Sequence, residues 1–134
     1  MKTFDVQNIE IKAPFEKVFG YLAEASNLPE WTSAFKSVSE GRALMHTPKG
    51  SIEIALAVNA SRKEGTVDWM MTFPDGNVAH AYSRVVKAGK DRSIYSFILM
   101  APPVPLEQLE GALAQQSNTL REELAKLRAV LSED

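Results

Sequence analysis

Residues 104–134 carry the longest regular pattern of hydrophobic positions in the chain. Leucines recur there at steps of three, four and seven residues, and polar or charged side chains fill most positions between them. The pattern predicts one long amphipathic helix, roughly 40 Å from end to end, whose apolar stripe the rest of the chain must cover. Three prolines directly ahead of it fit a helix start. The prolines are Pro102, Pro103 and Pro105, and the stripe consists of Leu106, Leu109, Leu113, Leu120, Leu124, Leu127 and Leu131.

The start of the chain predicts a strand followed by two helices. Residues 3–12 alternate between apolar and polar, with one change of phase at Gln7-Asn8, as in a strand with a bulge. Pro14 and Glu16 suit the start of a helix, and a second, short helix is expected near Pro29. The buried face of the first helix is expected to consist of Phe15, Val18, Phe19, Leu22 and Ala25.

Residues 35–100 alternate with a period of two, and clusters of turn residues cut the pattern at 47–50, 61–65, 74–76 and 88–91. Short turns between alternating segments predict five antiparallel strands with one dry face. The inward positions are expected to be Ile52, Ile54, Leu56 and Val58, then Val67, Trp69, Met71 and Phe73, and finally Tyr95, Phe97 and Leu99.

The strand at 77–87 has two possible registers, because a slip of one residue exchanges its faces. A three-residue loop before it turns Ala79, Ala81, Ser83 and Val85 inward, whereas a four-residue loop turns His80, Tyr82 and Arg84 inward. We prefer the first register, because it keeps the charge of Arg84 out of an apolar interior. It also lines the inner face with small side chains, which leave room there.

Composition narrows the possible functions. The 134 residues fit one domain, 1–134, and the absence of cysteine excludes disulfides and cysteine-ligated metal. A net charge of -2 gives no support to nucleic-acid binding. The two histidines, His46 and His80, have no metal-binding spacing, so we expect neither metal nor cofactor. No secretory signal or apolar run of membrane-spanning length is present, so we expect a cytoplasmic protein without integral membrane association.

The opening of the chain carries a family resemblance. Residues 9–19, Ile-Glu-Ile-Lys-Ala-Pro-Phe-Glu-Lys-Val-Phe, with Tyr21-Leu22 and then Asn27-Leu28-Pro29-Glu30-Trp31, resemble the opening motif of the START-like, polyketide-cyclase/dehydrase superfamily (SRPBCC). A gapped resemblance continues through residues 65–69 to the final helix. It implies an α+β helix-grip fold of order β-α-α-β-β-β-β-β-α, in which a curved antiparallel sheet wraps around the long C-terminal helix. It also implies a cavity for apolar or amphipathic small molecules.

The function that we expect first is binding or carriage of a hydrophobic small molecule, either a lipid or a polyketide-like ring. The competing interpretation is that the same large side chains simply fill a core. Gly111 within the long helix favours a close neighbour there, since glycine costs about 1 kcal/mol relative to alanine in a helix. The candidate ligand-binding residues are Trp69, Met71, Tyr95, Phe97, Leu109 and Leu113.

Two other function classes remain open. A cyclase or dehydratase needs a proton donor or acceptor inside the cavity, and His46 with Tyr95 is the pair that we would test. An interaction module would use the leucine-rich end at 120–131 as a partner or homodimer helix, if its stripe extends beyond the sheet.

Overall fold

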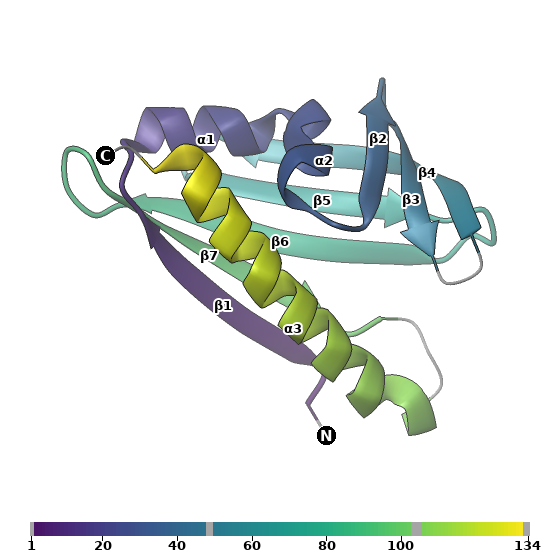
Figure 1. Cartoon of the computed structure of the whole chain (residues 1–134). Helices are drawn as coiled ribbons and strands as arrows, with labels where there is room; N and C mark the ends of the chain where they lie inside the picture. The colour runs from purple at the N-terminus through teal and green to yellow at the C-terminus, as the bar shows by residue number, and fades with distance from the viewer. Residues whose placement is uncertain (1, 48–49, 103–105, 133–134) are drawn as a thin grey trace.

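The computed structural model describes residues 2–47, 50–102 and 106–132. It confirms the α+β class, with two short helices after the first strand and a long helix at the end of the chain (Figure 1). The elements are β1 Phe4–Ile11, α1 Phe15–Ala23, the 3₁₀ turn η1 Ala25–Asn27, α2 Leu28–Trp31, β2 Phe35–Ser39, β3 Arg42–Thr47, β4 Gly50–Ser61, β5 Thr66–Thr72, β6 Val78–Lys87, β7 Ser93–Met100 and α3 Leu106–Leu131.

The strands form one antiparallel sheet in the order β1-β7-β6-β5-β4-β3-β2. Strands β2 to β7 follow one another as a meander, and β1 joins the far side of β7, with Ile9 opposite Tyr95. Helix α3 crosses one face of this sheet (Figure 1). The helix-grip arrangement that the sequence predicts is therefore present.

The sheet contains one strand more than the sequence pattern predicts. We expect a single strand between residue 35 and the turn at 47–50, and the structure has β2 and β3 there. Ser39 pairs with Arg42, so Glu40 and Gly41 form a two-residue hairpin turn. Both have positive φ, 48° and 78°, which is the conformation that tight hairpin turns require. Glutamate seldom adopts this conformation, so the pair does not stand out as a turn in the sequence.

The bulge predicted in the first strand is wrong, because β1 pairs with β7 without a register shift and Phe4 and Val6 face outward. The inward faces predicted for β4 to β7 are confirmed. Ala81, Ser83 and Val85 of β6 are buried while Tyr82 and Arg84 are exposed, so the preferred register is the observed one. On β5 and β7, Val67, Trp69, Tyr95 and Phe97 are buried. The alternation arises because each strand packs one face against the helices.

The C-terminal half of α3 supplies the helical side of the core. Leu120, Leu124, Leu127 and Leu131 are all buried in the main hydrophobic cluster. No apolar stripe is therefore exposed at 120–131, and the expected partner helix at that end is wrong. The end of the helix is also held by polar contact, since the Lys12 backbone N–H donates to Ser132 Oγ at 3.2 Å.

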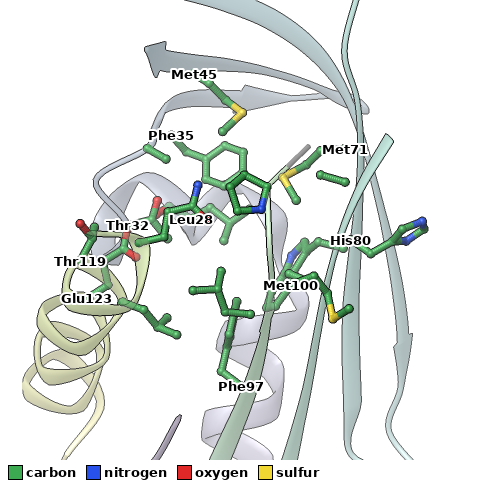
Figure 2. Close-up of a pocket in the computed structure, with 18 of the residues that line it drawn as sticks. Leu28, Thr32, Phe35, Met45, Met71, His80, Phe97, Met100, Thr119 and Glu123 are labelled. Carbon is green, nitrogen blue, oxygen red and sulfur yellow. The ribbon is translucent and has the colours of Figure 1, made fainter. Parts of the chain in front are cut away.

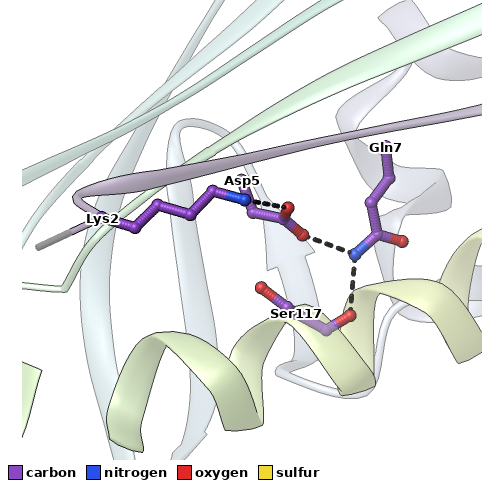
Figure 3. A network of polar contacts seen from close by, with 4 residues as sticks. All are labelled: Lys2, Asp5, Gln7 and Ser117. Carbon is purple, nitrogen blue, oxygen red and sulfur yellow. Dashed lines mark hydrogen bonds and ion pairs between the residues drawn. The ribbon is translucent and has the colours of Figure 1, made fainter. Parts of the chain in front are cut away.

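The middle of α3 is held to β1 by a polar network (Figure 3). The amide Nε2 of Gln7 donates to the Ser117 carbonyl oxygen at 2.8 Å and to Asp5 Oδ2 at 2.9 Å. Lys2 Nζ donates to the other Asp5 oxygen at 3.3 Å. The hydrogen bond from Gln7 is the main cause that lowers the pKa of Asp5 below its usual value.

One expectation about Gly111 is not met, and expectations about four other residues are not tested by the structure. Apart from the helix's own backbone, none of the described residues has an atom within 4 Å of where a Cβ on Gly111 would stand, so the close neighbour that we expected is not found among them. The turn residues Pro48 and Lys49 and the prolines Pro103 and Pro105 lie outside the described residues, so the structure does not test them.

Candidate functional site

A pocket of about 470 Å³ lies between the inner face of the sheet, α2 and the middle of α3 (Figure 2). The side chains of Phe35, Met45, Met71 and Phe97 surround one space, and Thr119 and Glu123 face it from α3. The pocket is thus built by segments from most of the chain.

The sheet supplies an apolar wall. Trp69 and Met71 come from β5, and Phe97 and Leu99 come from β7, each at an inward position of the alternation. The rings of Trp69 and Phe97 stack with centroids 6.0 Å apart, which fixes them as one aromatic surface. Between these strands β6 contributes small side chains, including Ala81, and their size leaves the space open.

The short helix α2 and the strands after it supply a second apolar wall. Leu28 and Trp31 of α2 line the pocket, followed by Phe35 of β2 and Met45 of β3. Leu28 and Trp31 are almost completely buried, so they are fixed parts of the core that also face the cavity. Both tryptophans of the chain therefore lie at the pocket.

The third side of the pocket is polar. It is formed where the loop after α2 meets α3, and it contains Thr32, Ser33, Gln116, Thr119 and Glu123. Glu123 Oε2 accepts a hydrogen bond from the Ser33 backbone N–H at 2.6 Å and another from Ser33 Oγ at 3.2 Å. Burial raises the pKa of Glu123, and the two hydrogen bonds from Ser33 oppose this effect. The arrangement places a carboxyl group at the edge of an apolar cavity.

Two buried donors at the aromatic wall have no hydrogen-bond partner in the part of the chain that the structure describes. They are Trp69 Nε1 and Tyr95 Oη. Burial also raises the pKa of Tyr95, with a smaller contribution from Asp68, while the nearby Ser83 hydroxyl lowers it. An unpaired buried donor costs about 1–3 kcal/mol, so the indole N–H of Trp69 is unusual for a residue that only fills a core.

The structure divides the predicted ligand-binding residues into two groups. Trp69, Met71 and Phe97 line the pocket. Tyr95, Leu109 and Leu113 do not: Tyr95 is fully buried next to Phe97, Leu113 is buried on α3, and Leu109 is half-buried on the same helix.

The predicted catalytic pair is not brought together. His46 lies exposed on β3, whereas Tyr95 is buried on β7, and the strands β4, β5 and β6 lie between them. Four inter-strand spacings amount to roughly 19 Å across a flat sheet, too far for a proton to pass directly. The other histidine, His80, contacts the pocket region, but its side chain points away from the cavity (Figure 2). It stacks on Tyr82 of the same strand.

Sequence reasoning misses the polar side of the pocket. Glu123 directly precedes Leu124 of the leucine stripe, so its place beside the stripe is a usable signal in hindsight. Its contact with Ser33 joins residues 90 positions apart and has no signature in the sequence.

The described residues contain neither a cluster suited to a metal ion nor a membrane-spanning helix. Within residues 2–47, 50–102 and 106–132, no group of three His, Cys, Asp or Glu side chains is placed to hold a metal ion. No helix in the same ranges is long and apolar enough to cross a membrane.

Comparison with known proteins gives matches at the level of structure. No model of a protein family matches the chain, and no curated protein matches it either. Among solved structures, the protein XoxI from Bacillus cereus is 16% identical, with 97% of this chain and 96% of that chain covered and a TM-score of 0.70. A START superfamily protein from Mycobacterium smegmatis is 15% identical, with 92% and 94% covered and a TM-score of 0.63.

The Zhui aromatase/cyclase from Streptomyces sp. R1128 is also similar. It is 11% identical, with 96% of this chain and 90% of that chain covered and a TM-score of 0.65. At such low identities the likeness concerns the fold. The chain therefore has the START-like, helix-grip fold that aromatase/cyclases share, over nearly its full length.

Proposed function

We propose that this protein binds and carries a hydrophobic small molecule, a lipid or a polyketide-like ring, in the pocket between the sheet and α3. The observation that carries the proposal is the apolar pocket of about 470 Å³. This volume lies within the range of about 300–1,000 Å³ that is typical of small-molecule sites. Burial of about 250 Å² of apolar ligand surface is worth roughly 6 kcal/mol before the ligand's ordering cost.

The polar groups at the pocket support an amphipathic ligand rather than a plain hydrocarbon. Glu123 and Thr119 stand on one side, where a hydroxyl group of the ligand can donate to the carboxylate. The indole N–H of Trp69 lacks a partner among the described residues, and an oxygen acceptor that reaches it would satisfy it. The aromatase/cyclase with the same fold supports an oxygenated aromatic ring as one test ligand.

The test is a fluorescence titration of the full chain with two probes, dodecanoic acid and a hydroxyanthraquinone. Both tryptophans, Trp31 and Trp69, line the pocket, so the intrinsic tryptophan emission reports its occupancy. We expect saturable quenching or a blue shift with at least one probe. Emission that changes with neither probe would contradict the proposal.

A matched pair of variants locates the binding. Ala81 lies on the inner face of β6 and lines the pocket, so Ala81→Phe should fill the space and abolish binding. Ala57→Phe places the same ring at an outward position of β4 and should bind as the unaltered chain does. Circular dichroism shows whether both variants fold. Equal binding by both folded variants would place the site elsewhere.

A second candidate function, proton transfer on a ligand in the same pocket, is favoured by Glu123. A carboxyl group with a raised pKa at an apolar cavity is the kind of group that serves as a general acid or base. A cyclase or dehydratase of this kind would turn over a polyketide-like substrate. Its rate would fall at least about 100-fold in Glu123→Gln, while binding would persist. Without turnover of such a substrate, the carrier function stands alone.

A further inference from the structure

The outer face of the sheet exposes many large apolar side chains. Nine of them stand on β1, β5, β6 and β7, and each has between 37% and 47% of its surface exposed. We call these nine residues the outer patch. They are Phe4, Val6, Met70, Val78, Tyr82, Val86, Ile94, Ile98 and Met100, of which Val78, Tyr82 and Met100 also border the pocket.

The sheet register shows that most of the outer patch is continuous. Phe4 stands opposite Met100, and Val6 stands opposite Ile98. Ile98 in turn pairs with Tyr82 on its other side. Side chains of directly opposite residues touch on one face of a sheet, so an apolar row runs across β1, β7 and β6 through Val6, Ile98 and Tyr82. The next outward row, Asn8, Ser96 and Arg84, is polar and separates Ile94 and Val86 from it.

The apolar character is confined to one half of the outer face. The outward positions of β4 are Ser51, Glu53, Ala55, Ala57 and Asn59, which are small or polar. An antiparallel sheet with one solvated face normally shows polar outward positions of this kind. In the part of the chain that the structure describes, no helix covers the other half (Figure 1). If another molecule covers the apolar half, this would explain why its outward positions are apolar while those of β4 are small or polar.

The exposed area of the outer patch is close to that of one side of a standard interface. The nine residues together expose roughly 700 Å², against about 800 Å² per subunit in a standard interface and a few hundred Å² in the largest apolar patch of most monomers. The polar neighbours at its margin would complete the contact.

We infer that the outer patch is the interface between two copies of this chain, which pack sheet against sheet about a two-fold axis. A two-fold axis brings the same apolar face of both copies together, and two sheets pack well with their strands nearly aligned. The charges nearby have both signs, including the Glu10–Arg92 ion pair, and the chain has a net charge of -2. A lipid surface would instead favour a rim with surplus positive charge.

The experiment is sedimentation velocity of the purified full chain between 1 and 300 µM, with Ile98→Lys as the test variant. Ile98 is at the centre of the outer patch and does not line the pocket. We expect a species of about twice the 14.8 kDa of one chain. We also expect Ile98→Lys to weaken the dimer at least about 100-fold, because a lysine buried between two apolar faces lacks a partner.

Two further variants keep the result interpretable. Val6→Lys lies on the edge strand β1, where a charged residue is well tolerated by the fold, and it should also produce monomers. Ser51→Lys adds the same charge to the polar half of the outer face, opposite His46 of β3, and should leave the dimer intact. Circular dichroism checks that each variant is folded.

Three outcomes would overturn the inference. The first is a monomer of the unaltered chain at every concentration. The second is a dimer that neither Ile98→Lys nor Val6→Lys weakens, since its interface would lie elsewhere. The third is a monomer that cosediments with phosphatidylcholine vesicles and loses this binding in Ile98→Lys, because the patch would then face a lipid surface.

Discussion

Among the glycines of the chain, Gly65 has the least room for a side chain. Its φ is +76°, and its carbonyl oxygen accepts from the Val85 N–H at 2.8 Å, which joins the β4–β5 turn to β6. A Cβ atom at this position would lie 2.2 Å from the Val85 carbonyl oxygen, so backbone would have to move. The turn therefore depends on glycine for both its conformation and its contact.

We predict that Gly65→Ala lowers the free energy of unfolding by about 3 kcal/mol, from left-handed strain together with the clash. Gly76→Ala is the matched control, because Gly76 has φ +89° but no atom within 4 Å of the added Cβ. It should cost only about 1 kcal/mol. Urea unfolding measures both values, and equal losses would show that the contact with Val85 is unimportant.

Glu123 gives a prediction about pH. Because burial raises its pKa above the usual 4.5, the folded protein binds this proton more tightly than the unfolded chain does. The resulting stabilisation is fully present below about pH 4.5 and is lost as the pH rises through the pKa of the folded state. Glu123→Gln cannot ionise, so it should become more stable relative to the unaltered chain as the pH rises from about 4.5 through the folded-state pKa of Glu123.

The measurement is urea unfolding of both proteins at five or more pH values. Glu110→Gln is the matched control, because Glu110 is exposed on the same helix and does not affect the pKa of Glu123. The difference in the free energy of unfolding between this control and the unaltered chain should vary much less with pH. A constant difference for Glu123→Gln would mean that the folded environment does not disfavour its charged form.

At the scale of single residues, the sequence predicts side chains that follow a period and misses those that depend on long-range contact. Trp69, Met71 and Phe97 are assigned to the inner face because strands alternate, and they line the pocket. The contact between Ser33 and Glu123 is not predictable in this way, because it depends on how a loop and a helix meet in space.

Helix α3 is the element whose two halves differ most. Its C-terminal leucines belong to the core cluster, whereas its N-terminal half carries Gly111, which has no neighbour within 4 Å of an added Cβ. A glycine in such a position weakens a helix by its conformational freedom and offers no packing in return.

We predict that Gly111→Ala raises the free energy of unfolding by about 0.5–1 kcal/mol, or leaves it unchanged if this half of the helix frays before the rest unfolds. Thermal unfolding measures the change, and hydrogen exchange of residues 107–115 should slow. A loss of stability would mean that something does approach the helix at Gly111, such as a bound ligand or a partner.

Elements with strong periodicity are predictable from the sequence, and those that depend on one turn are not. The leucine spacing of α3 and the alternation of β4 to β7 are sufficient to predict the type of each element and its inward face. The turn at Glu40-Gly41 gives no such signal, since a glutamate at φ 48° is unusual, and the pattern therefore predicts one strand where β2 and β3 lie.

Over the whole molecule, the sheet carries large apolar side chains on both faces, and we propose a different role for each. The inner face is covered by the helices and leaves a pocket of about 470 Å³, while half of the outer face remains exposed. The fold is predictable, because the opening motif and the order of elements resemble a known superfamily. The open pocket is not, because side-chain size and rotamer at positions such as Ala81 and Met71 decide whether the space is filled.

The central claim is that this space holds a hydrophobic ligand, and native mass spectrometry of freshly purified protein tests it most directly. We predict a bound species with one ligand per chain, which is released on activation, recovered by organic extraction and absent from Ala81→Phe. Ligand-free protein that also fails to bind dodecanoic acid and a hydroxyanthraquinone when they are added would contradict the account.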